Sequence, residues 1–375
     1  CCEHFEEALQ LFTQLPKHNV KPNNLTLVAI MQACSDIFVL DGGRLIHSYI
    51  IRNNITLNTF ISSSLIDMYT RCGGLEDAQN IFDNLYRKDV VSWNVLISGY
   101  AKYGALEKAR ELFDHLFEPD ISSWNVLITG YAQHGLDDEV VKLFHVMCGE
   151  GFSPDAITFI LVLKSCGNIG SLEIGEEIDV EIREQGLLHE DVMLANALVD
   201  MYSNCGLLIR AQEIFDNLVI HDIISWTSLI TGYAHVGDIE NAFYNFERMI
   251  REGTQPNLVT CIAIVNACSH AGVVDIGLMF FELMNKGYSA MALPEVYNCI
   301  VDLLGRAGQL NNVIAMIEIM PFHPDIVAWH TLMGACKKWS DVELGTQAFE
   351  HIKHFGVPDA AAYICISNIY VKADI

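Results

Sequence analysis

Positively charged side chains are scarce in this 375-residue sequence, which has 22 lysines and arginines against 47 aspartates and glutamates. The formal net charge of −25 opposes the long-range attraction of phosphate groups, and it is the main argument against a role in nucleic-acid binding. Charged residues are few altogether, at 18%, whereas hydrophobic residues make up 51%. This balance is typical of an ordered protein with a large core and argues against a disordered chain.

Long apolar runs and metal-site motifs are also lacking. A bilayer-spanning helix needs about 20 apolar residues, and stretches such as 157–163 are far shorter. None of the 12 cysteines has Cys-x-x-Cys spacing, which favours reduced, buried thiols over disulfides or metal. His4-Phe-Glu6 matches only half of a zinc deaminase site. We therefore expect no membrane partner, no catalytic residues, no metal, no cofactor and no small-molecule substrate.

What the sequence does contain is an internal repeat, because one fifteen-residue segment occurs three times, at 90–104, 121–135 and 223–237. No linker rich in proline, glycine or serine interrupts the chain, and the same frame extends over most of its length. The complete repeats have 31 to 36 residues and cover 24–58, 59–89, 90–120, 121–155, 156–191, 192–222, 223–257, 258–293, 294–325 and 326–359.

Each repeat is predicted to form two helices. Numbered from the first residue of its repeat, position 15 is a glycine that ends the first helix, as in Gly73 and Gly104. Apolar residues at positions 4, 7, 8 and 11 give that helix one buried face. A small residue at position 20 and phenylalanine at position 24, as in Ala109 and Phe113, allow close packing of the second helix. Stacked helix-turn-helix repeats should therefore share one continuous core.

Two families of helical repeat have this length, the peptide-binding tetratricopeptide repeats and the RNA-binding pentatricopeptide repeats. The segments Ser92–Tyr100, Asn196–Tyr202 and Tyr297–Gly308 closely resemble pentatricopeptide repeats, and the resemblance extends over essentially the whole chain. It implies an all-α fold, a right-handed α-solenoid of about ten repeats.

The alternating repeat lengths resemble the PLS subclass of that family, with long motifs that begin at Asn24, Ala156 and Leu258. Segments within 326–375 resemble the extension motifs of organellar RNA-editing factors. We therefore predict a partial N-terminal repeat over 1–23, a PLS-type array over 24–325 and extension motifs over 326–375, with the second motif truncated.

The resemblance implies that each standard or short repeat recognises one RNA base through position 5 and its last residue. A short polar side chain at position 5 can hydrogen-bond the Watson–Crick edge of an unstacked base. The predicted recognition pairs are Ser63 with Asp89, Asn94 with Asp120, Asn125 with Asp155, Asn196 with Asp222, Thr227 with Asn257, and Asn298 with Asp325. By the family's code these pairs correspond to G, U, U, U, A and U.

The long motifs have apolar side chains at position 5, namely Val28, Ile160 and Ile262, and should not select a base. The predicted footprint from 5′ to 3′ is therefore any-G-U-U-any-U-A-any-U. Exposed apolar residues at position 2 should sandwich the bases. They include Phe60, Val91, Met193 and Ile224, whereas Ser122 and Glu295 depart from the pattern. Phosphate contacts are predicted at position 13 for Arg71, Lys102, Arg306 and Lys338.

Simpler interpretations exist for two of these features. Asparagine at position 5 could cap a helix rather than recognise a base. The cysteines at position 11, Cys34, Cys166, Cys268 and Cys336, are expected to pack in the core rather than act in redox chemistry.

The resemblance implies a mitochondrial or chloroplast protein that binds single-stranded organellar RNA and positions a deaminase partner for C-to-U editing. The alternative is a protein-binding scaffold in a large organellar assembly, where a net charge of −25 is no handicap.

Overall fold

The computed structural model describes residues 11–12, 14, 22–56, 58–189, 191–287, 294–355 and 360–373. Within these ranges every regular element is helical, with 21 α-helices and one short 3-10 helix. This confirms the predicted all-α fold. Much of the predicted partial repeat over 1–23 lies outside the described residues, as does His4-Phe-Glu6.

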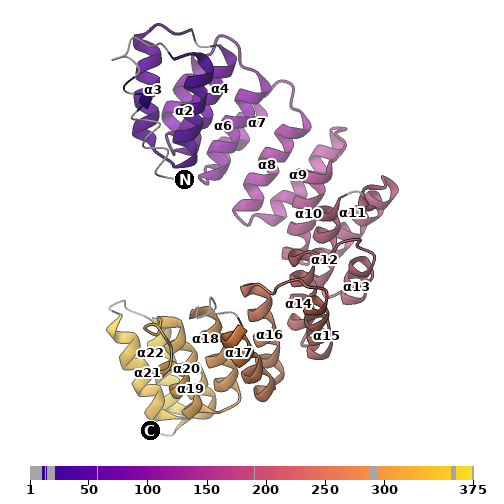
Figure 1. Cartoon of the computed structure of the whole chain (residues 1–375), viewed down its shortest axis with the longest axis vertical. Coiled ribbons are helices and arrows are strands. Elements are labelled where there is room, and N and C mark those ends of the chain that lie inside the picture. Colours follow the sequence, from indigo (N-terminus) through magenta and orange to yellow (C-terminus); the bar gives the residue numbers. More distant parts are fainter. Residues whose placement is uncertain are drawn as a thin grey trace. The chain divides into compact units, whose positions relative to one another are not determined.

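The helices occur in pairs that follow the predicted repeats, and they fall into two compact blocks (Figure 1). The N-terminal block, Cys1–Ile169, contains α2 (Asn24–Asp36), α3 (Leu40–Arg52), α4 (Thr59–Arg71), α5 (Leu75–Asp83), α6 (Val90–Lys102), α7 (Leu106–Asp114), α8 (Ile121–Gln133), α9 (Asp137–Gly149) and α10 (Ala156–Ile169).

The C-terminal block is Gly170–Ile375. It contains α11 (Leu172–Glu184), η2 (Leu187–His189), α12 (Val192–Asn204), α13 (Leu208–Asp216), α14 (Ile223–His235), α15 (Ile239–Arg251), α16 (Leu258–Ala271), α17 (Val274–Gly287), α18 (Pro294–Arg306), α19 (Leu310–Glu318), α20 (Ile326–Trp339), α21 (Val342–His354) and α22 (Ala360–Lys372).

The helix boundaries follow from local sequence signals. Each predicted repeat starts at the first residue of a helix, because the last residue of the preceding repeat often caps that helix. The Asp222 side chain, for example, accepts hydrogen bonds from the backbone N–H groups of Ile224 and Ser225 at 3.0 and 2.8 Å. At position 15 the glycines adopt positive φ angles, as predicted; Gly104 has a φ of 79°.

Within each block the first helices of successive repeats pack side by side. In the N-terminal block this layer consists of α2, α4, α6, α8 and α10, and in the C-terminal block of α12, α14, α16, α18, α20 and α22. The second helices α3, α5, α7 and α9, and likewise α13, α15, α17, α19 and α21, each pack against the first helix of their own repeat and that of the next. This stacking of helical hairpins is the solenoid arrangement that the repeat predicts.

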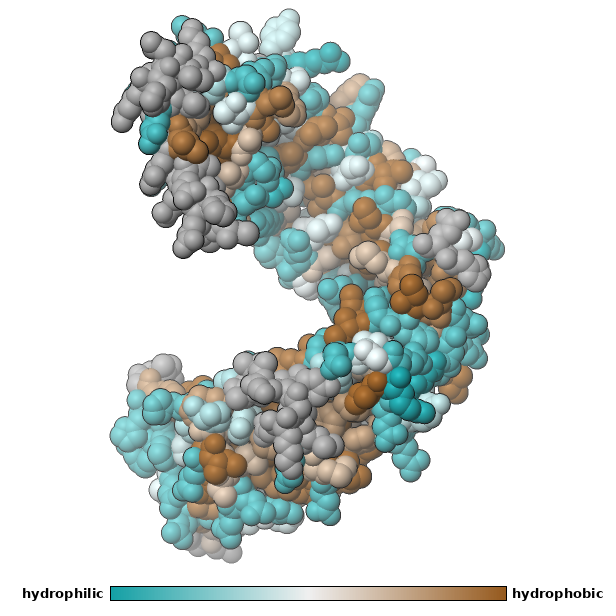
Figure 2. All heavy atoms as spheres, viewed as in Figure 1, coloured by the Kyte–Doolittle hydropathy of each residue, from teal (hydrophilic) through white to brown (hydrophobic). Residues whose placement is uncertain are grey.

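The core runs between the two layers and is built from the predicted positions. Trp124 at position 4 of one repeat is 1% exposed and contacts Phe113 at position 24 of the preceding repeat, with ring centroids 4.6 Å apart. Trp226 packs on Phe215 in the same way, at 4.5 Å. Small residues at position 20 allow this approach, since Ala109 is completely buried. The surface around this core alternates hydrophilic and hydrophobic side chains (Figure 2).

Candidate nucleic-acid interface

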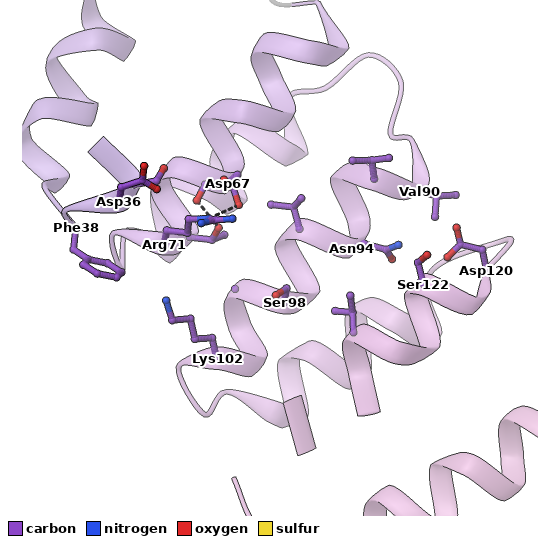
Figure 3. A pocket seen from close by; sticks show the side chains of 16 residues that line it. Asp36, Phe38, Asp67, Arg71, Val90, Asn94, Ser98, Lys102, Asp120 and Ser122 are labelled. Carbon is purple, nitrogen blue, oxygen red and sulfur yellow. Dashed lines mark hydrogen bonds and ion pairs between the residues drawn. The ribbon is translucent and has the colours of Figure 1, made fainter. Parts of the chain in front are cut away.

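The predicted recognition residues lie on one side of the first helices. Positions 2, 5, 9 and 13 are three or four residues apart, a spacing that places side chains on the same face of a helix. In α6 these positions hold Val91, Asn94, Ser98 and Lys102, and all four line a hollow of about 610 Å³. In Figure 3 the Asn94 side chain points from α6 toward Asp120, the residue that precedes α8.

Besides Asn94 with Asp120, three of the predicted asparagine–aspartate pairs form direct hydrogen bonds. The Asn125 amide donates to the two carboxylate oxygens of Asp155 at 3.0 and 3.1 Å. The distances are 3.1 and 2.9 Å from Asn196 to Asp222, and 3.3 and 3.2 Å from Asn298 to Asp325. The two members of each pair are 26 to 30 residues apart in the sequence. The structure therefore brings together the residues that the repeat frame pairs.

The aspartate of each pair also caps the next helix. Asp120 accepts from the Ser123 backbone N–H at 2.7 Å, and Asp325 accepts from that of Ala328 at 2.9 Å. The interpretation of position-5 asparagines as helix caps is wrong, because Asn125 and Asn196 lie inside α8 and α12. Since one carboxylate serves both purposes, the helix start in each of these pairs holds the amide of the previous repeat in a defined orientation.

Hydrogen bonding lowers the pKa of two of these carboxylates, those of Asp120 and Asp155. Burial opposes the charge of Asp120, but hydrogen bonds from the backbone and side chain of Ser123 and from the Asn94 amide outweigh it and lower the pKa. For Asp155, burial is likewise outweighed by hydrogen bonds from Thr158 and Asn125, and its pKa is also lowered. An ionised carboxylate accepts only, so Asn94 and Asn125 must turn their NH₂ groups toward these aspartates.

The amide oxygen of the asparagine is consequently the atom left for another partner. The Oδ1 atoms of Asn94 and Asn196 are buried and accept no hydrogen bond from any described residue. In Asn125 the corresponding oxygen accepts from the Thr158 hydroxyl at 2.7 Å. An unpaired buried acceptor costs about 1–3 kcal/mol, so a ligand N–H that reached Asn94 or Asn196 would recover that energy.

Where position 5 has a hydroxyl group, a residue that the sequence analysis did not single out completes the contact. Ser63 lies 3.1 Å from the Ser92 hydroxyl, which donates to Asp89 at 2.6 Å. Thr227 similarly lies 2.9 Å from Thr260, and Thr260 donates to Asn257 at 2.8 Å. Ser92 and Thr260 occupy position 3 of the following repeat. Serine and threonine recur at position 3, and this recurrence could have identified these residues from the sequence.

The apolar residues at position 2 are exposed, although residues of this type usually lie in the core. Phe60, Val91, Met193 and Ile224 are 54%, 60%, 67% and 58% exposed. These side chains project beside the recognition pairs at the start of the first helices. Flat aromatic ligands stack on surfaces of this kind. In the long motifs Val28, Ile160 and Ile262 are half-buried and offer no hydrogen-bonding group.

The four cations predicted at position 13 differ in whether a neighbouring carboxylate neutralises them. Arg71 and Arg306 form ion pairs with Asp67 and Asp302 of their own helices, at 2.9 and 2.8 Å. Lys102 lies over the Phe38 ring, with Nζ 5.1 Å from the centroid (Figure 3). Lys338 donates to the backbone oxygen of Arg306 at 2.9 Å. The two arginines are thus partly neutralised, whereas the two lysines have no carboxylate partner in the described part of the chain.

Cys34, Cys166, Cys268 and Cys336 are fully buried, which confirms that they pack in the core. Burial raises the pKa of the Cys336 thiol to about 12, aided by Asp341.

Among the described residues, no cluster of His, Cys, Asp or Glu is suited to hold a metal ion. Of the helices that the structure describes, none combines the length and apolar character needed to span a membrane.

Comparisons with known proteins identify the repeats. A model of the PPR repeat family matches residues 119–168 and 221–286, and a PPR repeat model matches 60–90, 91–118 and 194–223. Pentatricopeptide repeat-containing protein At2g20540 of Arabidopsis thaliana is 38% identical over 97% of this chain and 68% of its own length. The mitochondrial protein At2g03880 and the chloroplastic protein At1g08070, pentatricopeptide repeat-containing proteins of the same plant, are 32% and 31% identical over 99% and 95% of the chain.

The chain spans about half the length of most of these curated relatives, 53% of At2g03880 and 44% of At1g08070. Among solved structures, the pentatricopeptide repeat protein PPR10 from maize is similar, with a TM-score of 0.58 and 20% identity over 99% of this chain and 59% of that protein. A second structure shows PPR10 in complex with an 18-nt psaJ RNA element, with a TM-score of 0.56 and 21% identity over 98% of this chain and 60% of that protein. At these identities the likeness establishes the helical solenoid fold.

Proposed function

This chain belongs to the pentatricopeptide repeat family, and from that premise we propose that it binds single-stranded RNA in a sequence-specific manner along the first helices of its repeats. The observation that supports the proposal most directly is the recurring contact between position 5 and the last residue, as in Asn196 and Asp222. A protein-binding scaffold would not need the same polar pair at one frame position in repeat after repeat.

The chemistry of the asparagine pairs supports recognition of uracil. Each aspartate holds the amide NH₂ group, so the amide oxygen is the atom that remains to accept, and in Asn94 and Asn196 it has no partner among the described residues. Uracil offers a ring N–H donor on its Watson–Crick edge, which matches a buried oxygen without a partner in Asn94 and Asn196. Exposed Val91 and Met193 supply the apolar surfaces beside these oxygens.

The biological role follows from the family. We place the protein in a mitochondrion or a chloroplast, supported by relatives that are named mitochondrial and chloroplastic. We assign it to the PLS subclass as a site-recognition factor for C-to-U RNA editing. The segment 326–375 would dock or position a deaminase supplied by a partner or by the same polypeptide. The edited cytidine would lie about four nucleotides 3′ of the base recognised by Asn298 and Asp325.

A scaffold role in an organellar assembly is the second candidate, and a specific observation favours it. Besides the net charge of −25, two of the four position-13 cations are neutralised by aspartates of their own helices, which weakens their attraction for phosphate. A scaffold would bind protein partners and show no preference among RNA sequences.

A binding assay separates the two candidates. Fluorescence anisotropy would compare a nine-nucleotide RNA with the footprint any-G-U-U-any-U-A-any-U and a scrambled RNA of the same composition, at low and physiological salt. We expect the footprint RNA to bind at least tenfold more tightly. Equal affinities, or no binding of either RNA, would overturn sequence-specific recognition.

A substitution locates the recognition. In Asn196→Thr, preference at the sixth nucleotide should move from uracil toward a purine, with the other positions unchanged. Asn312→Thr is the matched control, because Asn312 lies on the second helix α19 and its amide donates to Gln309 of the same repeat. An unchanged profile for Asn196→Thr would remove that residue from the recognition set.

A further inference from the structure

The first helices of the last two repeats, α20 and α22, carry a net positive charge. In a protein with 47 acidic residues, α20 and α22 contain Lys337, Lys338 and Lys372 and no aspartate or glutamate. All three lysines lie at the carboxyl ends of these helices, where the negative end of the helix dipole favours a cation. The result is a local cluster of three positive charges at the carboxyl ends of α20 and α22.

These lysines gather around one hollow. Together with Gly334 and Asn368 they line a space of about 500 Å³, which we call the lysine hollow. Lys372 of α22 donates to the backbone oxygens of Lys337 and Lys338 at 3.3 and 3.0 Å, across to the end of α20. A Cβ added to Gly334 would meet no atom within 4 Å, so this part of the hollow is open space.

The positive charge of the lysine hollow is not neutralised internally. No carboxylate of the described residues lies within ion-pair distance of Lys337, Lys338 or Lys372, in contrast to Arg71 and Arg306. The recorded hydrogen bonds of Lys338 and Lys372 go to backbone carbonyls, and an ammonium group has three N–H donors. Donors therefore remain for an anion with several oxygen atoms.

The position of the hollow indicates which anion it binds. Lys338 and Lys372 continue the row of position-13 residues formed by His270 and Arg306, on the successive helices α16, α18, α20 and α22. The last recognition pair, Asn298 with Asp325, lies on the same side of this layer, at α18 and the start of α20. A strand that leaves Asn298 in the 3′ direction therefore passes next over α20 and α22.

We infer that the lysine hollow binds the phosphodiester backbone of the nucleotides immediately 3′ of the last recognised base, without selecting their bases. This rests on the proposed RNA binding. Position 5 of the repeat that starts at Ala360 is Ile364, which is exposed and has no hydrogen-bonding group, so a base there would not be discriminated. The segment 326–375 then contributes affinity to an array whose other cations are few.

The test uses two RNAs and one double variant of the full chain. The short RNA is the nine-nucleotide footprint, and the long RNA has four further nucleotides at its 3′ end. Wild-type protein should bind the long RNA more tightly at 50 mM KCl, with a steeper dependence on salt. In Lys337→Gln/Lys372→Gln the slope of log affinity against log salt for the long RNA should become shallower by about 1.4, because each contact to a single strand contributes about 0.7.

The control carries the same charge change elsewhere. Lys108→Gln/Lys353→Gln alters two lysines of second helices that pair with Glu111 and Glu350, and it should leave the gain from the 3′ extension intact. Circular dichroism melting checks that both variants fold. The double variant of the hollow should bind the short RNA as wild type does.

The outcomes distinguish the two proposals. If wild-type protein fails to bind the short RNA, the proposed function is overturned, and the inference that rests on it falls as well. If the short RNA binds but the extension adds no affinity, or if Lys337→Gln/Lys372→Gln keeps the full gain, the inference alone is overturned. The last outcome concerns a competitor, a hexaglutamate peptide added at a carboxylate concentration equal to the phosphate concentration of the RNA. If this peptide abolishes the affinity gained from the 3′ extension, the hollow is assigned instead to an acidic protein segment.

Discussion

One residue in the first complete repeat adopts a backbone conformation that its side chain disfavours. Phe38 occupies position 15, where most other repeats have glycine, and it takes the same left-handed conformation with a φ of 58°. A left-handed L-residue with a Cβ costs roughly 1–2 kcal/mol. The ring is 62% exposed and lies near the Lys102 ammonium, so burial does not offset that cost.

Replacement of Phe38 should therefore stabilise the N-terminal block, provided that the Cβ is removed. We expect Phe38→Gly to raise the free energy of unfolding by about 0.5–1 kcal/mol relative to Phe38→Ala, which keeps the strained Cβ. Urea denaturation followed by circular dichroism measures the difference. Equal stability of the two variants would show that residue 38 is not held in the left-handed conformation.

The lowered pKa of Asp155 makes the stability of its pair depend on pH. A carboxylate whose pKa is lower in the folded state stabilises that state above its unfolded value, near 4, and this contribution is lost as the pH falls through the folded value. Asp155→Asn keeps a side chain that can cap α10 but removes the charge.

We expect Asp155→Asn to be less stable than wild type by about 1 kcal/mol at pH 7, because a hydrogen bond to a charged acceptor is stronger than one to a neutral acceptor. The difference should shrink toward pH 3. Denaturation at pH 7, 5 and 3 measures it, with Glu247→Gln on the exposed face of α15 as the control. A difference that stays constant with pH would exclude a charged Asp155 as the source.

At the scale of the helix, the layer of first helices depends on glycine at position 10. Gly130 in α8 faces Ala101 in α6, and a Cβ on Gly130 would clash with the Ala101 Cβ, far inside van der Waals contact. Neither group is the flexible end of a long side chain, so the helices themselves would have to separate. Gly334 in α20 is the opposite case, because an added Cβ there would meet nothing within 4 Å.

These two glycines should respond to alanine with opposite signs. Gly130→Ala should destabilise the protein by about 1–3 kcal/mol through overpacking. Gly334→Ala should stabilise it by about 0.5–1 kcal/mol, because alanine loses less entropy than glycine in a helix. Thermal and urea unfolding of the two variants measure both effects. A Gly130→Ala variant as stable as wild type would mean that α6 and α8 do not approach as closely as described.

Local sequence predicts where the helices begin, but it does not predict how neighbouring repeats contact each other. The starts of helices were predictable because capping residues and apolar periodicity act within a few residues, and Asp120 and Asp222 mark them directly. Tyr103 and His134 were not predictable as inter-repeat contacts. The Tyr103 hydroxyl and His134 Nε2 donate to the backbone oxygens of Arg71 and Ala101, one repeat away, at 2.9 and 2.8 Å. Such contacts depend on how closely neighbouring helices approach.

For the molecule as a whole, a net charge of −25 implies substantial self-repulsion. Part of the acidic excess lies in the first turns of second helices, as in Glu76 and Asp77 of α5 and Asp137 and Asp138 of α9, where it complements the helix dipole. The first helices, which carry the recognition pairs, are poorer in acidic residues.

Salt should consequently have opposite effects on stability and on RNA binding. Between 20 mM and 0.5 M KCl, screening of the self-repulsion should raise the Tm by a few degrees. Over the same range the affinity for the footprint RNA should fall, because counterions compete for the few cations. Scanning calorimetry and anisotropy measure the two trends. A Tm that fell with salt would mean that ion pairs, rather than repulsion, dominate the electrostatics of the folded state.

The repeat length and the helical pairs follow from the sequence alone, because the local rules that set them recur every 31 to 36 residues. The pairing of position 5 with the last residue was implied by the resemblance to the family. Only the tertiary structure decided which atoms of those residues are free. The carboxylate of Asp222 holds the Asn196 amide, Asp67 neutralises Arg71, and Lys337, Lys338 and Lys372 meet without a counter-charge. The physical reason is that hydrogen bonds and ion pairs require atoms within about 3 Å, and that distance is set by how neighbouring helices pack.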